Sequence, residues 1–201
     1  MYSESTSTGD YSSAALVKQT DFNEQVGMEG RFVATCYDKD GNVKWEEVID
    51  NLVVAAGKAL MLDTILAGSS FTATVVMGLV SGASVPTYAA TDTQSSHAGW
   101  LESGGANAPT YSGTRKTPTF SAATSAGVSP ANITTKTTSA PVTFTFTGSG
   151  TVAGCFININ GSSTIDNTTG TLYSAGSFTG GNKTVASTDQ LNVTYSTTAT
   201  S

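Results

Sequence analysis

The sequence predicts a mostly β fold, an antiparallel, jelly-roll-like β-sandwich with one short helix. Of the 201 residues, 34 are Thr and 25 are Ser, and the β-branched Thr side chain favours pleated sheet over helix. Apolar residues make up 38% of the chain, in short runs separated by clusters of Gly, Asn, Ser and Pro, which is typical of strands and turns. This share of apolar residues is enough to bury a core, unlike that of disordered segments.

Residues 1–26 are predicted to be an N-terminal docking arm, and residues 27–201 to be the β-sandwich domain. The arm is polar, with Tyr2, Tyr11 and Phe22 as isolated aromatic residues. A polar terminus is usually ordered only where it is tied down, so we expect these three residues to contact a partner. The arm has neither the basic region nor the apolar region of a secretory signal, so synthesis in the cytoplasm is expected.

A hairpin and a helix are predicted to follow the arm. Residues 30–54 form two runs of alternating apolar and polar residues around Asp40, Gly41 and Asn42, which is typical of a tight turn. An EF-hand calcium loop is disfavoured, because Gly comes fourth in "DKDGN" rather than sixth. Residues 55–67 are predicted to form the single helix, ended by Gly68. The helix is apolar on nearly all sides, so we expect the sheet to cover it.

Short strands are predicted after the helix, at residues 71–82, 115–120, 140–148, 151–159, 170–178 and 190–196. The segment "TFTFTGSGTVAGCFINI" is predicted to be a hairpin with Phe144 and Phe146 on one face and Gly-Ser-Gly as its turn. Cys36 and Cys155 each lie in an apolar run, which indicates two buried free thiols rather than a disulfide. The loop of about thirty residues from Val85 to Arg115 is long enough to suggest a functional or partner-binding role.

The net charge of −6 belongs entirely to the first third of the chain. Residues 1–65 contain eleven acidic and five basic residues, whereas the remaining 136 residues contain four of each. An acidic third repels phosphate and the neutral remainder does not attract it, so no nucleic-acid partner is expected. No run approaches the ~20 apolar residues of a membrane span, so no membrane partner is expected either. A neutral, hydroxyl-rich surface suits contacts with proteins or sugars.

His97, the only histidine, lies three positions before Trp100 in "SSHAGWLES". A catalytic triad could draw on Asp92 or Glu102 as its acid, but the G-x-S-x-G elbow is missing from the sequence. Neither cysteine lies near His97 in sequence, which disfavours a metal site, and no Walker-type phosphate loop occurs. We therefore predict no catalytic residue, cofactor or metal, and a structural role for His97 and Trp100 as anchors of their loop.

Several ordered segments carry a resemblance to a known class of proteins. They are "GNVKWEEVIDNLVVAAGKALMLDTILAGSS", "VVMGLVSGASVPTYAATDT", "SHAGWLE" and the closing "DQLNVTYSTTAT". Between Gly30 and Thr200 the chain resembles small virion structural proteins of tailed bacteriophages, which include capsid decoration, head-fibre and tail-associated proteins. The resemblance implies a hairpin leading into one helix, a variable loop with "HAGW", a closing strand, and a place in the virion.

Two functions are compatible with that resemblance. The preferred one is a non-enzymatic capsid decoration, or cement, protein that binds the assembled major capsid protein as a dimer or trimer and gains strength by avidity. The alternative is a head-fibre, tail-fibre or adaptor module that contacts host-surface glycans, with Tyr111, Tyr173 and Tyr195 as candidate sugar-binding aromatic residues. A hydrolase lacks any convincing set of catalytic residues.

Overall fold

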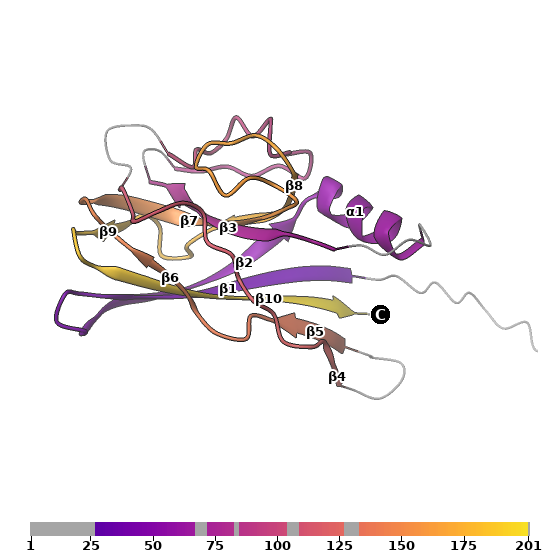
Figure 1. The fold of residues 1–201 in the computed structure, drawn as a ribbon, viewed down its shortest axis with the longest axis horizontal. Coiled ribbons are helices and arrows are strands. Elements are labelled where there is room, and N and C mark those ends of the chain that lie inside the picture. The colour runs from indigo at the N-terminus through magenta and orange to yellow at the C-terminus, as the bar shows by residue number, and fades with distance from the viewer. Residues whose placement is uncertain (1–26, 67–71, 83–84, 104–108, 127–132, 201) are drawn as a thin grey trace, which may run out of the picture.

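The computed structural model describes residues 27–66, 72–82, 85–103, 109–126 and 133–200, which form ten strands and one helix (Figure 1). The strands are β1 (Gly27–Tyr37), β2 (Val43–Val53), β3 (Val75–Ser81), β4 (Thr124–Ala126), β5 (Ile133–Thr137), β6 (Val142–Thr145), β7 (Gly150–Ile159), β8 (Thr171–Ser177), β9 (Lys183–Val185) and β10 (Gln190–Thr200), and the helix is α1 (Ala55–Leu66). The predicted mostly β fold and its single helix are confirmed. The predicted docking arm lies outside the described residues.

The ten strands form one continuous antiparallel sheet in the order β3-β7-β8-β2-β1-β10-β5-β4, with β6 added to β10 and β9 added to β7. Strand β2 belongs to both halves of this sheet. It pairs with β1 between Val43 and Asn51, and then with β8 through Leu52 and Val53. The first half, with β1, β10, β6, β5 and β4, faces the second half, with β8, β7, β3 and β9 (Figure 1). This arrangement is compatible with the predicted sandwich.

The predicted hairpin at Gly41 is confirmed as the β1–β2 connection. Gly41 has φ +82°, a left-handed conformation that glycine adopts at no steric cost. The carboxylate of Asp38 accepts backbone hydrogen bonds from Asp40 and Asn42 at 2.9 Å. Hydrogen bonds from the side chain and backbone of Asn42 lower the pKa of the exposed Asp38 carboxyl. The turn is therefore held by one carboxylate as well as by glycine.

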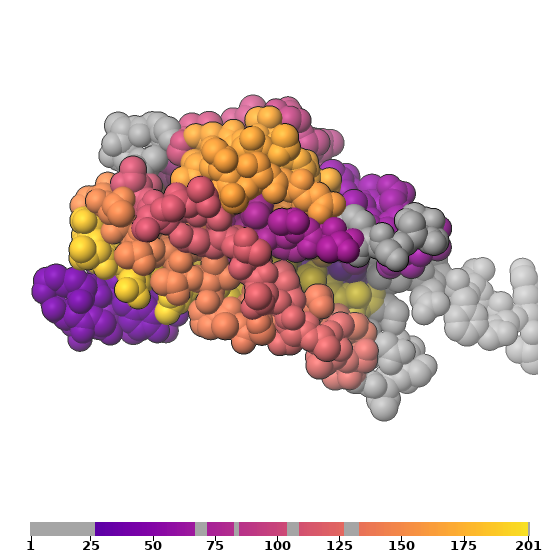
Figure 2. Space-filling view, in the orientation of Figure 1, coloured from indigo at the N-terminus to yellow at the C-terminus, as the bar shows by residue number. Residues whose placement is uncertain are grey.

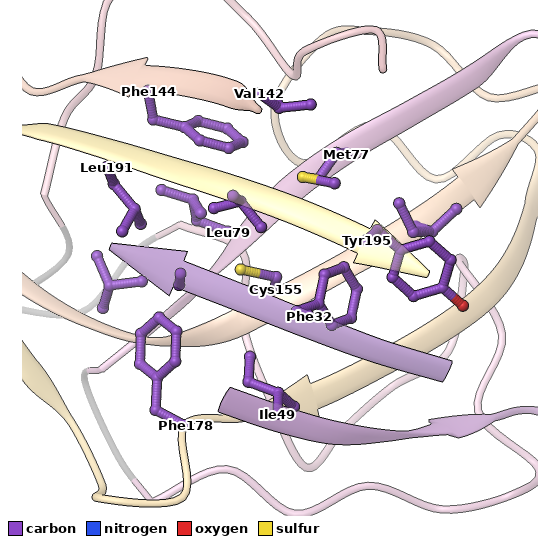
Figure 3. Packing of buried hydrophobic residues seen from close by; sticks show 14 of the residues in the cluster. Phe32, Ile49, Met77, Leu79, Val142, Phe144, Cys155, Phe178, Leu191 and Tyr195 are labelled. Atoms are coloured by element: carbon purple, nitrogen blue, oxygen red, sulfur yellow. The ribbon is translucent and has the colours of Figure 1, made fainter. Parts of the chain in front are cut away.

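A single apolar core lies between the two halves (Figure 3). Along β1 every second residue from Gly30 to Cys36 is buried, and Phe32 lies opposite Tyr195 of β10 with ring centroids 4.5 Å apart. The second half contributes Met77, Leu79, Val152, Cys155 and Ile157 to the same core. Cys36 and Cys155 are fully buried and unpaired, as predicted. Burial raises the pKa of both thiols, that of Cys36 to about 12.

Two strand predictions are wrong in detail. Strands β6 and β7 do not pair, because β6 pairs with β10 while β7 pairs with β3, β8 and β9. The segment at Gly148 and Ser149 therefore leads from one half of the sheet to the other. Both runs place apolar side chains in the shared core, but an apolar run shows that a strand is buried and not which strands lie beside it. The predicted strand at 115–120 is reduced to isolated bridges at Lys116 and Phe120.

Helix α1 is not covered by the sheet, contrary to expectation. Gly57 is its one buried residue, and a Cβ at that position would lie 2.6 Å from the carbonyl oxygen of Tyr173 on β8. Leu62 and Ile65 are 61% and 72% exposed. The helix contacts the core through Ala56, Gly57 and Met61, while Leu62, Ile65 and Leu66 remain exposed. Within the described ranges, no helix has the length and hydropathy to cross a membrane.

Candidate functional site

The site residues predicted from the sequence fall into two groups. Tyr2, Tyr11 and Phe22 lie outside the described residues. His97 and Trp100 lie in the long loop that follows β3, and this loop packs on the outer face of β7 and β8. Figure 2 shows the loop together with residues 160–170, drawn in orange, over one side of the domain. A second surface, which was not predicted, lies on helix α1.

Trp100 is the centre of the covering loop. Its side chain is 1% exposed and packs on Phe156 of β7, with ring centroids 5.3 Å apart. The indole Nε1 donates a hydrogen bond to Asp92 Oδ2 at 3.2 Å, and the backbone N–H of Ala89 donates to the same oxygen at 3.1 Å. The tilted ring of Tyr88 lies 6.0 Å from Trp100. A buried indole needs a partner for its N–H, and Asp92 supplies it from within the loop.

His97 lies against Trp100 rather than against a reactive group. Its ring stacks on the indole with centroids 3.8 Å apart and an interplanar angle of 17°. The Nδ1 atom makes a hydrogen bond of 3.0 Å with the backbone carbonyl oxygen of Trp100. In the part of the chain that the structure describes, no carboxylate, thiol or hydroxyl is hydrogen-bonded to His97. Both contacts are of the kind that fixes the shape of a loop.

A buried ion pair between Glu102 and Arg115 anchors the same loop at its far end. The two side chains are 2% and 0% exposed, and the guanidinium binds the carboxylate through both Nε (2.8 Å) and Nη2 (2.5 Å). Arg115 also donates to the backbone carbonyls of Ser162 and Asn167 at 3.0 and 2.8 Å. Its guanidinium carbon lies 5.2 Å from the centroid of Phe156. Every charge here has a partner, which is what makes burial of an ion pair tolerable.

Residues 160–170 complete this polar cluster. The backbone N–H of Asp166 donates to Glu102 Oε2 at 2.7 Å, and the Asp166 carboxylate accepts hydrogen bonds from the backbone N–H and the hydroxyl of Ser103. Asn158, which is fully buried, donates from its amide to the carbonyl of Thr169 at 3.0 Å. Two loops distant in sequence are thus joined over the outer face of β7. The sequence analysis missed this cluster, although the scarcity of charges after residue 65 could have drawn attention to Glu102 and Arg115.

The three tyrosines considered for sugar binding do not form an exposed platform. Tyr111, Tyr173 and Tyr195 are 9%, 5% and 1% exposed. Burial is the largest effect on their hydroxyl groups, and it raises the pKa of each. Sugars stack on accessible aromatic faces, so these side chains do not offer that contact. Among the described residues, no group of three or more His, Cys, Asp or Glu side chains is placed to hold a metal ion.

The second surface is an apolar groove beside α1, which we call the α1 groove. Its larger part has a volume of about 220 Å³ and its smaller part about 180 Å³. Met61 and Ile159 border both parts, and Ile65 borders the smaller one. The remaining lining is mainly apolar and aromatic, with Leu60, Thr64, Val75, Phe120, Lys136, Ile157, Tyr173, Tyr195 and Thr197. Together with the exposed side chain of Leu62, the groove makes one continuous apolar region at the helix.

These two surfaces differ in what they offer. The loop over β7 is closed by polar contacts and leaves its histidine and its buried charges engaged, whereas the α1 groove is open, apolar and suited to binding another protein segment.

Comparison of the chain with protein-family models, with curated proteins and with solved structures found no match.

Proposed function

We propose that this protein is a non-enzymatic structural component of a tailed-bacteriophage virion, and most specifically a decoration protein that binds the assembled capsid lattice as a homo-oligomer. The observation that carries the proposal is the apolar face of α1. A twelve-residue helix with one buried residue and exposed Leu62, Ile65 and Leu66 is an exposed apolar region of the kind that marks a protein interface.

The rest of the domain supports a scaffold role. Its core is closed, and its long loop is pinned by Trp100 and by the ion pair of Glu102 with Arg115. His97 stacks on the Trp100 ring and makes a hydrogen bond with the Trp100 carbonyl oxygen. A rigid β domain that presents one apolar surface binds partners without needing to rearrange. The resemblance of the ordered sequence segments to virion proteins gives that partner its class, the proteins of a phage shell.

Decoration works through the assembled lattice. A protein that contacts neighbouring subunits at once gains avidity that free subunits cannot give, because the second contact forms at high effective concentration. Binding to the assembled shell alone then stabilises the shell by mass action. In this proposal each copy of the homo-oligomer supplies one such contact, and residues 1–26 and the α1 surface take part in the contacts between proteins. The buried tyrosines remove the specific support for a glycan-binding fibre module.

Deletion of residues 2–25 tests the contact made by the arm. The truncated protein should still fold and unfold cooperatively on heating, because the described core contains no residue before Met28. It should be lost from purified particles, because the contacts made by the arm, on which the avidity of the homo-oligomer depends, are missing. Particle-bound protein is measured by quantitative immunoblotting after sedimentation, with the full chain as the control. Equal amounts of both proteins on the particles would contradict the arm's role.

Averaged cryo-electron microscopy density of particles tests the position. Density at repeated capsid lattice sites, absent from particles made without this protein, is the expected result. A few copies at a vertex or in the tail would favour a fibre or adaptor over decoration. Absence from the particle would refute the virion role altogether.

A further inference from the structure

The α1 groove raises the question of what covers it. Ile65 and Leu62 are mostly exposed and the groove beside them is lined by apolar side chains. Exposed apolar surface is stabilised by burial at roughly 25 cal/mol per Å². The occupant should therefore be an apolar segment that can lie along a narrow groove.

A series of hydrogen bonds places the beginning of β1 beside the groove. The hydroxyl of Tyr173 contacts Met61 Sδ of α1 at 3.4 Å and Thr197 Oγ1 of β10 at 2.9 Å. Thr197 Oγ1 in turn donates to the carbonyl oxygen of Glu29 at 3.1 Å. The described part of β1 begins at Gly27, two residues before Glu29. The side chains of Thr197 and Tyr173 link the Glu29 carbonyl to Met61 of the helix. Residues 1–26 precede Gly27 in the sequence.

The composition of the preceding segment fits the groove. Residues 14–17 are Ala-Ala-Leu-Val, and Phe22 follows five positions later. Residues 11–26 carry Asp21, Glu24 and Lys18, a net charge of −1. Among the residues that line the groove, Lys136 is the one that is charged, so the lining has a net charge of +1. An apolar, acidic segment is thus complementary to an apolar groove with a slight positive charge.

The direction of β1 favours a groove on a neighbouring molecule. Gly27 is still paired with Thr200 at the end of the sheet, so the chain enters β1 in an extended conformation at the end of the domain where α1 also lies (Figure 1). To occupy its own groove, the segment would have to reverse direction within a few residues of Gly27. An extended segment of 26 residues spans up to about 85 Å, which is ample to reach a second copy.

We propose that residues 11–26 of one copy bind in the α1 groove of a second copy, and that two copies exchange these segments reciprocally. The exchange rests on the proposed function, because it identifies the neighbour that the arm contacts as another copy of the same chain. Two identical arms and two identical grooves related by a twofold axis give a closed, self-complementary interface. Each copy then buries the apolar surface of the other.

Disulfide trapping between two different chains tests the exchange. Asn23→Cys in an affinity-tagged chain and Ile65→Cys in an untagged chain are mixed and mildly oxidised, and the two native cysteines do not interfere because both are fully buried. A tagged–untagged disulfide dimer is expected. The matched control replaces Ile65→Cys by Val85→Cys, since Val85 is an equally apolar residue that is 85% exposed elsewhere, and should give no more than background cross-linking.

The double variant with both cysteines in one chain separates the two possible occupants. A disulfide that forms within single chains at high dilution, with no disulfide between chains at any concentration, would show that the arm binds its own groove and would overturn the exchange. Absence of any disulfide between the two positions, with both variants folded, would overturn it as well.

Ile65→Asp provides a second measurement that does not depend on trapping. Self-association of the full chain, measured by sedimentation velocity over a concentration series, should weaken by about tenfold or more. Val85→Asp should leave it unchanged, and circular dichroism should show the same fold for both. A full chain that is monomeric at all concentrations, or equal association of both variants, would overturn the exchange. The particle location would stand independently, because cryo-electron microscopy can find monomers on the shell.

Discussion

The outer face of β7 and the exposed face of α1 are both apolar, but the described residues cover only the first of them. Over β7, Phe156 is fully buried beneath Trp100, which belongs to the covering loop and is itself 1% exposed. On α1, Ile65 is 72% exposed. The first surface is therefore part of the folding of the domain, whereas the second stays exposed among the described residues.

The two elements differ in how many of their polar groups need a partner from elsewhere in the protein. The loop over β7 runs across apolar side chains, and Asp92 accepts the hydrogen bond of the buried indole while Glu102 and Arg115 pair with each other. Helix α1 satisfies its own backbone and needs no such partners. A helix can therefore present an apolar face without leaving polar groups unpaired, which makes it the simpler element to leave open for binding.

Trp100→Ala should have the largest effect on the covered surface. Removing a buried indole from the outer face of β7 should lower the free energy of unfolding by about 4 kcal/mol, measured by urea denaturation. Leu101→Ala is the matched control, because Leu101 is the next residue and is 48% exposed; it should lower stability far less. Similar losses in both variants would mean that the loop does not act as part of the core.

Arg115→Met should have the next largest effect. It leaves the Glu102 carboxylate buried without its charge partner, which should lower the free energy of unfolding by about 3 kcal/mol. The pair Glu102→Gln and Arg115→Met should recover part of the loss. Arg31→Met is the control, because Arg31 and Asp50 form an exposed pair with side chains 57% and 86% exposed, and exposed pairs contribute little. A loss no larger than that of the control would exclude a structural role for the buried pair.

The strands and the helix could be predicted because each depends on local pattern. Alternation of apolar and polar residues marked β1 and β10, and the turn residues around Gly41 marked the hairpin of β1 with β2. Strand β7 behaves differently, since residues 152–158 are all buried. A run that is buried on both faces has no alternation to reveal its neighbours, so its pairing with β3 and β8 rather than with β6 was not predictable.

In the long loop, the contact of His97 with Trp100 could be predicted but the pairing of Glu102 with Arg115 could not, for a related reason. His97 and Trp100 are neighbours in sequence, so their contact could be anticipated. Glu102 and Arg115 contact each other and residues 160–170 only in the folded protein. Glu102 and Asp166, for example, are 64 residues apart in the sequence. The exposure of α1 was not predictable at all, because an apolar helix in a sequence looks the same whether its own sheet or a partner covers it.

His97→Ala should have a modest effect. The variant loses the hydrogen bond from His97 to the Trp100 carbonyl and the stacking of the half-buried imidazole on the indole. This loss should lower the free energy of unfolding by about 1 kcal/mol. The measurement is again urea denaturation, together with the near-ultraviolet signal of Trp100. Full stability with an unchanged tryptophan signal would show that the histidine does not hold the loop in shape.

Glu47→Gln should have the smallest effect, and that effect should depend on pH. Burial raises the pKa of Glu47, but hydrogen bonds from Lys183 and from the Gly180 N–H, together with the Lys183 charge, outweigh it and hold the pKa below its usual value. A carboxyl with a lowered folded pKa stabilises the fold above its unfolded pKa of about 4.3, and this contribution is lost as pH falls through the folded pKa. Wild type should therefore exceed the variant in stability at pH 7, and the two should converge as the pH falls through the folded pKa of Glu47.

The matched control for this prediction is Glu46→Gln, because Glu46 is the adjacent residue and its side chain is exposed. Urea unfolding midpoints of all three proteins at pH 7, 5 and 3 make the comparison. A gap between wild type and Glu47→Gln that stays constant with pH would mean that packing, rather than charge, accounts for the role of Glu47. A gap that closes on acidification would place a charge-dependent contact on β2, the strand shared by both halves of the sheet.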